Sequence, residues 1–154
     1  MATTTATCTL SSPDILSQAI SVSSTTTLIK DGTAATGLEQ LNYHRALIPT
    51  GTQFDLIPES AALNTNPANY VYIINKNTDV TDFAVISIKD EVIGSLYAGD
   101  WMFIPWSNSV TETEDAQSGQ GNDTSIEITA TTHDCVIEYA LFHSGETLIT
   151  ADDA

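Results

Sequence analysis

Short runs of β-branched and aromatic residues, each ended by Gly, Pro, Asn or Asp, recur along this chain and constrain its fold more than any other feature. The clearest run is Tyr70–Ile74, because such residues favour strands. No segment shows a strong helical period. Several short strands separated by turn residues are typical of an all-β sandwich or barrel. We predict strands at residues 45–48, 53–57, 70–74, 83–88, 92–96, 101–104, 126–130 and 135–142.

The length of 154 residues fits one domain. We predict an antiparallel β-sandwich, or a jelly-roll-like barrel, over residues 15–144. Residues 1–14, rich in Thr and Ser, are predicted to be an extended N-terminal arm that a partner orders, and residues 145–154 an acidic tail. Residues 13–20 fit either the start of a short helix or a strand that continues through Val22.

The charge balance argues against several classes of function. The chain has 20 acidic and 4 basic residues and a net charge of −16. Contacts to nucleic-acid phosphates need clustered Lys and Arg, whereas the cations here are scattered at Lys30, Arg45, Lys76 and Lys89. An anionic membrane surface would repel the protein. We therefore expect neither a nucleic-acid partner nor a membrane partner.

The N-terminus and the cysteines indicate where the protein is made. The first residues lack the basic region and the apolar region of a signal peptide, so we expect synthesis in a cytoplasm. Cys8 and Cys135 are expected to be free thiols, although the two could pair. Cys135 lies in an apolar strand pattern, which predicts that it is buried.

Histidine and cysteine occur without the pattern of a catalytic or zinc site. His133 and Cys135 would share one face of a strand, but two residues fall short of the roughly four ligands of a structural zinc site. Cys135 could also form a thiol dyad with His133 or His143. A buried thiol is inert, however, so we predict no catalytic residue at this position.

Acidic residues gather in two places that we interpret as solvated turns. Glu112, Glu114 and Asp115 lie in a polar loop over residues 107–124, and Asp79 and Asp82 lie in a hairpin turn. A glycosidase needs two carboxyl groups that face each other across a rigid cleft, which a solvated loop does not provide. Weak calcium binding by these carboxylates is the alternative interpretation. We predict no enzyme activity, no cofactor and no metal site.

Two tryptophans flank Pro105. We expect Trp101 to fill the core and Trp106 to cap one edge of the sandwich; the alternative is that they are exposed and bind a sugar ring or a partner. The residues that we consider for partner binding are Thr3, Thr4, Thr5, Thr7, Leu10, Trp101 and Trp106.

The second half of the chain follows one scheme. A strand and a polar hairpin span Asn69–Thr78, and a second strand spans Val85–Ile88. The segment Ile93–Trp106 then contains Leu-x-x-Gly-Asp-Trp-x-x-x-Pro, and the scheme closes with the strand Val136–Phe142. Over residues 69–142, about half of the chain, this scheme resembles small virion proteins of tailed bacteriophages.

The resemblance implies a structural role at the surface of a virion that is assembled in the host cytoplasm. The best fit is a capsid decoration (cement) protein that docks on the major capsid protein as a homo-oligomer, often a trimer. An acidic surface suits the outside of a shell, away from packaged DNA. Tail, neck or head-fibre components are an alternative, as is a carbohydrate-binding β-sandwich that uses Trp101 or Trp106.

Overall fold

The computed structural model describes residues 4–13, 19–28, 40–57, 69–88, 90–106 and 125–143. Within these ranges no helix is long and apolar enough to cross a membrane. The regular elements are the strands β1 (Thr4–Ser12), β2 (Ile20–Leu28), β3 (Gln40–Ile48), β4 (Gln53–Ile57), β5 (Asn69–Asn75), β6 (Phe83–Ile88), β7 (Glu91–Tyr97), β8 (Trp101–Trp106), β9 (Ile126–Ala130) and β10 (Cys135–His143).

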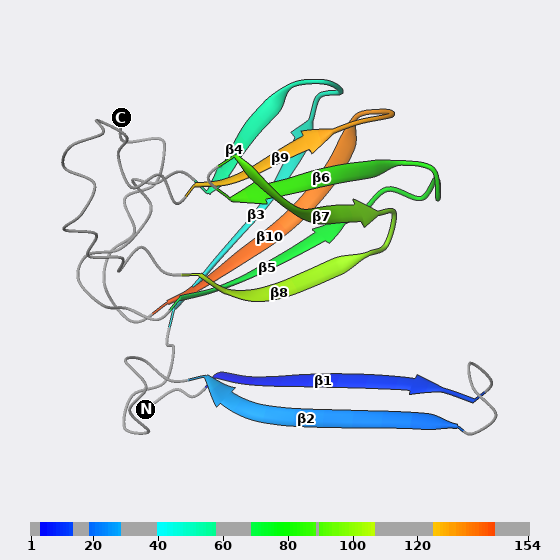
Figure 1. Cartoon of the computed structure of the whole chain (residues 1–154). Helices are drawn as coiled ribbons and strands as arrows, with labels where there is room; N and C mark the ends of the chain where they lie inside the picture. The colour runs from blue at the N-terminus through cyan, green and yellow to red at the C-terminus, as the bar shows by residue number, and fades with distance from the viewer. Residues whose placement is uncertain are drawn as a thin grey trace.

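Eight of these strands form a sandwich of two antiparallel sheets (Figure 1). One sheet has the order β3-β10-β5-β8 and the other has the order β4-β9-β6-β7. Each predicted run from residue 45 onward lies within one of these strands. The predicted all-β antiparallel sandwich is therefore confirmed.

The core lies between the two sheets because alternate residues of each strand point inward. In β5, Val71 and Ile73 are fully buried, and in β10 Cys135 and Ile137 are fully buried. The predicted burial of Cys135 is confirmed, and both cysteines are free. The opposite sheet contributes Leu56, Ile57, Ala84, Ile86, Leu96, Ile126, Ile128 and Ala130 to the same cluster.

The N-terminal residues differ from the predicted extended arm. β1 pairs with β2 along its whole length, from Thr4 opposite Leu28 to Ser12 opposite Ile20. This hairpin is a sheet of its own beside the sandwich, so β2 belongs to neither four-stranded sheet (Figure 1). Of the alternatives for residues 13–20, a strand begins at Ile20. Residues 14–18, Thr3, the loop 107–124 and the tail 145–154 lie outside the described residues.

Candidate functional site

The outer face of the β3-β10-β5-β8 sheet carries aromatic side chains. Because Val71 and Ile73 point into the core, Tyr70 and Tyr72 point outward. The register places Tyr72 opposite Phe103 of β8 on one side and Ala140 of β10 on the other. We call this outer surface the aromatic face, and its large apolar and aromatic members are Leu41, Tyr43, Leu47, Tyr70, Tyr72, Ile74, Trp101, Phe103, Val136 and Phe142.

The rings of the aromatic face pack against one another across the strands. Tyr70 and Phe103 stack with centroids 5.4 Å apart. Tyr72 and Trp101 lie 6.1 Å apart, and Phe142 meets the edge of Phe103 at 5.9 Å. Such cross-strand aromatic pairs stabilise a sheet. Trp101 nevertheless stays 53% exposed, whereas Tyr70, Tyr72, Phe103 and Phe142 are half-buried.

The two tryptophans of β8 occupy opposite environments. Trp101 lies on the aromatic face, so the prediction that it fills the core is wrong. Trp106 is 4% exposed and belongs to the core cluster, so its ring is not available to a partner in this structure. The two residues are an odd number of positions apart in one strand, which directs their side chains to opposite faces.

The β1–β2 hairpin also has two unlike faces. Its hydroxyl face consists of Thr5, Thr7, Thr9, Ser11, Ser21, Ser23, Thr25 and Thr27. Cross-strand hydrogen bonds join Thr7 to Thr25 at 3.0 Å and Thr9 to Ser23 at 3.2 Å on that face. Its apolar face carries Ala6, Cys8, Leu10, Val22 and Leu28. No charged residue occurs in either strand.

The apolar face of the hairpin and the aromatic face lie opposite each other across a pocket of about 530 Å³. Cys8 and Leu28 lie on the hairpin side of this pocket, and Tyr70 and Trp101 lie on the sheet side. The structure thus brings the N-terminal segment near Trp101, two regions that we had considered separately for partner binding. Of those residues, Thr4, Thr5, Thr7 and Leu10 lie in β1.

One ionic group lies on the same outer surface, in the cross-strand row that ends at Trp101. Glu138 of β10 is 3.8 Å from Arg45 and 3.9 Å from Lys76. A hydrogen bond to the Glu138 carboxylate raises the pKa of Tyr43. Glu138 is therefore matched by cations, and the rest of the aromatic face is uncharged.

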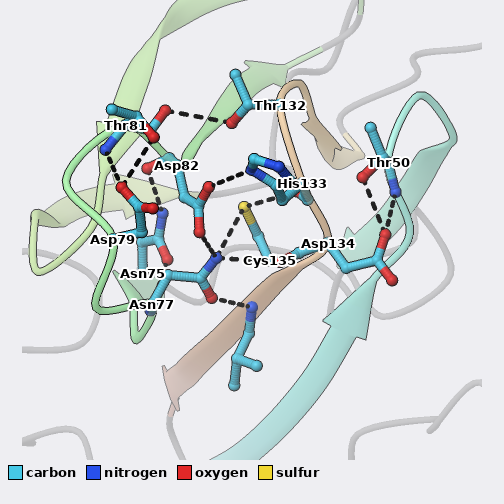
Figure 2. Close-up of polar contacts among 11 residues, drawn as sticks. Thr50, Asn75, Asn77, Asp79, Thr81, Asp82, Thr132, His133, Asp134 and Cys135 are labelled. Carbon is cyan, nitrogen blue, oxygen red and sulfur yellow. Dashed lines mark hydrogen bonds and ion pairs between the residues drawn. The ribbon is translucent and has the colours of Figure 1, made fainter.

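A polar network ties together the turns at one end of the sandwich (Figure 2). Asn75 is fully buried. Its Nδ2 donates to the carbonyl of Leu96 at 3.0 Å, and its Oδ1 accepts from the backbone N–H of Asn77 at 3.0 Å. Asn77 in turn donates from Nδ2 to Asp82 Oδ2 at 2.9 Å and accepts at Oδ1 from the N–H of Val136. From the sequence, these asparagines are predicted only to lie in a polar hairpin.

The same network contains the histidine and the cysteine considered for catalysis. Nδ1 of His133 lies 2.7 Å from Oδ1 of Asp82, and the Cys135 thiol donates to the backbone carbonyl of His133 at 3.5 Å (Figure 2). Burial, followed by the nearby Asp82 carboxylate, raises the pKa of Cys135. Both effects favour the neutral thiol, which is the opposite of what a nucleophilic cysteine needs.

Cys135 is therefore expected to be unreactive in the folded protein. In a Cys8→Ser variant, the remaining thiol should react with an aromatic disulfide reagent at least about a hundredfold more slowly in buffer than in urea, because the thiolate is both rare and covered. Absorbance of the released thiolate measures the rate. Similar rates in the two solutions would restore Cys135 as a candidate nucleophile.

Two exposed carboxylates are fixed by threonine in these turns. Asp134 Oδ1 accepts from the backbone N–H of Thr50 at 2.8 Å and from its hydroxyl at 2.9 Å. Asp79 Oδ1 accepts from the N–H and the hydroxyl of Thr81 in the same way. In each case these hydrogen bonds favour the charged form, so the pKa is lowered from 3.8.

Replacing Thr50 by valine is expected to raise the pKa of Asp134 toward its ordinary value, since one of the two hydrogen bonds is lost. A carboxyl group with a lowered pKa stabilises the folded state above its unfolded-state pKa, and this stabilisation is lost as the pH falls through the folded-state pKa. The variant should therefore lose less stability than the wild type between about pH 5 and pH 2. Carbon NMR titration of Asp134 measures the pKa, with Thr52→Val as the control. An unchanged Asp134 titration curve in the Thr50→Val variant would contradict the conclusion that the Thr50 hydrogen bonds lower the pKa of Asp134.

No metal centre is formed by the residues that the structure describes. None of them belongs to a group of three or more His, Cys, Asp or Glu side chains that could hold an ion. Asp79 and Asp82, considered above for calcium, direct their carboxylates to Thr81, Asn77 and His133. No family model matches the chain, and no curated protein matches it. The candidate functional site is the aromatic face together with the hairpin, which border one pocket.

Proposed function

We propose that this protein is a non-enzymatic structural protein of a phage virion, which decorates the outer surface of the major capsid protein shell and stabilises it. It acts as a homo-oligomer, and a trimer fits best. The observation that carries the proposal is the uncharged β1–β2 hairpin, which stands outside the sandwich and pairs with neither of its sheets.

The hairpin fits a docking element for a protein surface. Its strands leave their outer edges unpaired within the described part of the chain, and such edges can add to a strand of a partner. A chain with a net charge of −16 repels an acidic shell wherever its carboxylates meet that shell. The hydroxyl face of the hairpin instead presents neutral hydrogen-bonding groups. Many copies on one shell would reinforce a weak individual contact.

The proposal predicts that the hydroxyl face is needed for attachment. A Thr9→Asp, Ser23→Asp double variant places two carboxylates at a directly paired position of that face. Its affinity for purified heads should fall at least about tenfold, because each charge must be desolvated in the contact. Cosedimentation with heads measures binding. A Thr52→Asp, Thr78→Asp variant adds the same charge in exposed turns and should bind like the wild type.

Immunogold electron microscopy on purified particles locates the protein. Label distributed over the head supports decoration of the shell. Label confined to the tail, the neck or a fibre assigns the protein to that structure instead. Particles without label, together with heads that fail to bind the wild-type protein, would overturn the virion proposal.

A carbohydrate-binding module is the second candidate, and the exposure of Trp101 favours it. Aromatic rings stack on the apolar faces of sugars, and Trp101 borders a pocket with Tyr72 and Phe103. This candidate requires glycan-array binding that Trp101→Ala abolishes. Trp106→Ala is not an informative test, because Trp106 is part of the core.

A further inference from the structure

Two apolar surfaces of the chain face each other and leave much of each other exposed, although Leu28 of the hairpin is buried. The apolar face of the hairpin and the aromatic face border the pocket of about 530 Å³. Leu10 and Val22, paired directly across the hairpin, are 64% and 57% exposed. On the aromatic face Leu41 and Tyr43 are similarly exposed. Exposed apolar side chains that gather on one face of a sheet mark a site of protein association.

The hairpin needs a covering surface more than the sandwich does. An isolated two-stranded hairpin is at best marginally stable in water, and within the described residues β1 and β2 pair only with each other. Their strands contain no Lys, no Pro and no other residue type that usually protects a free strand edge. A surface that packs against the apolar face of the hairpin would supply the missing stability.

Charge favours a second copy of this chain as the source of that surface. Two copies, each with a net charge of −16, repel each other wherever their acidic surfaces meet. The strands of the hairpin have no charged residue, and the acidic residue among the described residues of the aromatic face, Glu138, lies near Arg45 and Lys76. The two surfaces can therefore meet between copies without like-charge contact.

We propose that the β1–β2 hairpin of one copy packs its apolar face onto the aromatic face of a second copy, so that the copies exchange hairpins. The eleven residues 29–39, which separate β2 from β3, can reach about 36 Å when extended. The contact joins unlike surfaces, so it closes as a reciprocal pair or as a ring. It gives the homo-oligomer of the proposed function its interface, but it does not depend on capsid binding.

The molar mass of the full chain in solution tests the association. By light scattering, the wild type is expected to be an oligomer that dissociates on dilution. A Leu10→Asp, Val22→Asp variant should raise the dissociation constant at least about tenfold, because both carboxylates would enter an apolar contact. The Thr9→Asp, Ser23→Asp variant places the same charges on the opposite face of the hairpin and should associate like the wild type. A monomeric wild type at about 100 μM, a concentration that saturates micromolar association, would overturn the proposal, as would equal weakening by both variants.

A mixed disulfide tests the exchange itself. Cys8 and Phe103 line the pocket from opposite sides. A chain with Cys8→Ser and Phe103→Cys is mixed with wild-type chain and oxidised gently. Exchange predicts a disulfide between Cys8 of one chain and the thiol at position 103 of the other, mapped by peptide mass spectrometry. Oligomers without this link would overturn the hairpin exchange.

Particle binding separates this result from the proposed function. A monomeric Leu10→Asp, Val22→Asp variant should bind heads more weakly than the wild type, because it has lost multivalency. This result would support both the exchange and the decoration role. Oligomers that form by exchange but bind no head support the exchange and overturn the decoration role.

Discussion

Replacing Ile73 by alanine is expected to lower the free energy of unfolding by about 2–5 kcal/mol. Ile73 is fully buried in β5, a central strand of its sheet, and belongs to the core cluster between the two sheets. The substitution removes apolar atoms from the core and leaves a cavity that the surrounding strands fill only in part, so both effects add. Urea unfolding followed by tryptophan fluorescence measures the change.

The matched control is Ile93→Ala. Ile93 lies in the edge strand β7 and is 48% exposed, so the same substitution should cost less than about 1 kcal/mol, mostly through strand propensity. Equal losses at the two positions would mean that the interior does not lie between the two sheets as described.

Replacing Asn75 by alanine is expected to cost about 3 kcal/mol. The side chain is buried and holds the Leu96 carbonyl and the Asn77 N–H, two groups that the substitution would leave without this partner. A buried polar group without a hydrogen bond costs about 1–3 kcal/mol. Hydrogen exchange should also show faster exchange of the Asn77 amide.

Thr78→Ala, an exposed position of the same turn, is the control for Asn75 and should stay within about 0.5 kcal/mol of the wild type. If Asn75→Ala lowered the free energy of unfolding as little as this control, water would have to replace the hydrogen bonds of the Asn75 amide. The network of turns would then contribute less to stability than its geometry indicates.

Local sequence patterns were enough to predict the sandwich but not the side of each strand that faces the core. The run Tyr70–Ile74 predicted a strand because its residue types favour strands locally. In β8, however, Trp101, Phe103 and Ile104 make both faces of the strand apolar. The alternation of apolar and polar residues therefore does not indicate which face is buried. Trp101 was assigned to the core for this reason, although it lies on the aromatic face.

The N-terminal hairpin and the polar network were missed for different reasons. Ala6, Cys8 and Leu10 alternate with threonine, a period-two signal that indicates a strand with two unlike faces; the abundance of Thr and Ser obscured it. The network joins Asn77 to Asp82 and to residues after His133, more than 50 positions away in the sequence. Contacts of this kind depend on strand pairing, which composition and spacing do not reveal.

The tied turns have a consequence for how the chain can vary in length. Figure 1 shows the strands running between two ends, and the connections 49–52, 76–82, 98–100 and 131–134 all lie at the end held by the Asn75 network. An insertion there would displace a hydrogen-bonding partner of a neighbouring turn. The turns of the tied end should therefore keep their lengths, and an epitope tag or a fused domain placed in one of them should destabilise the fold.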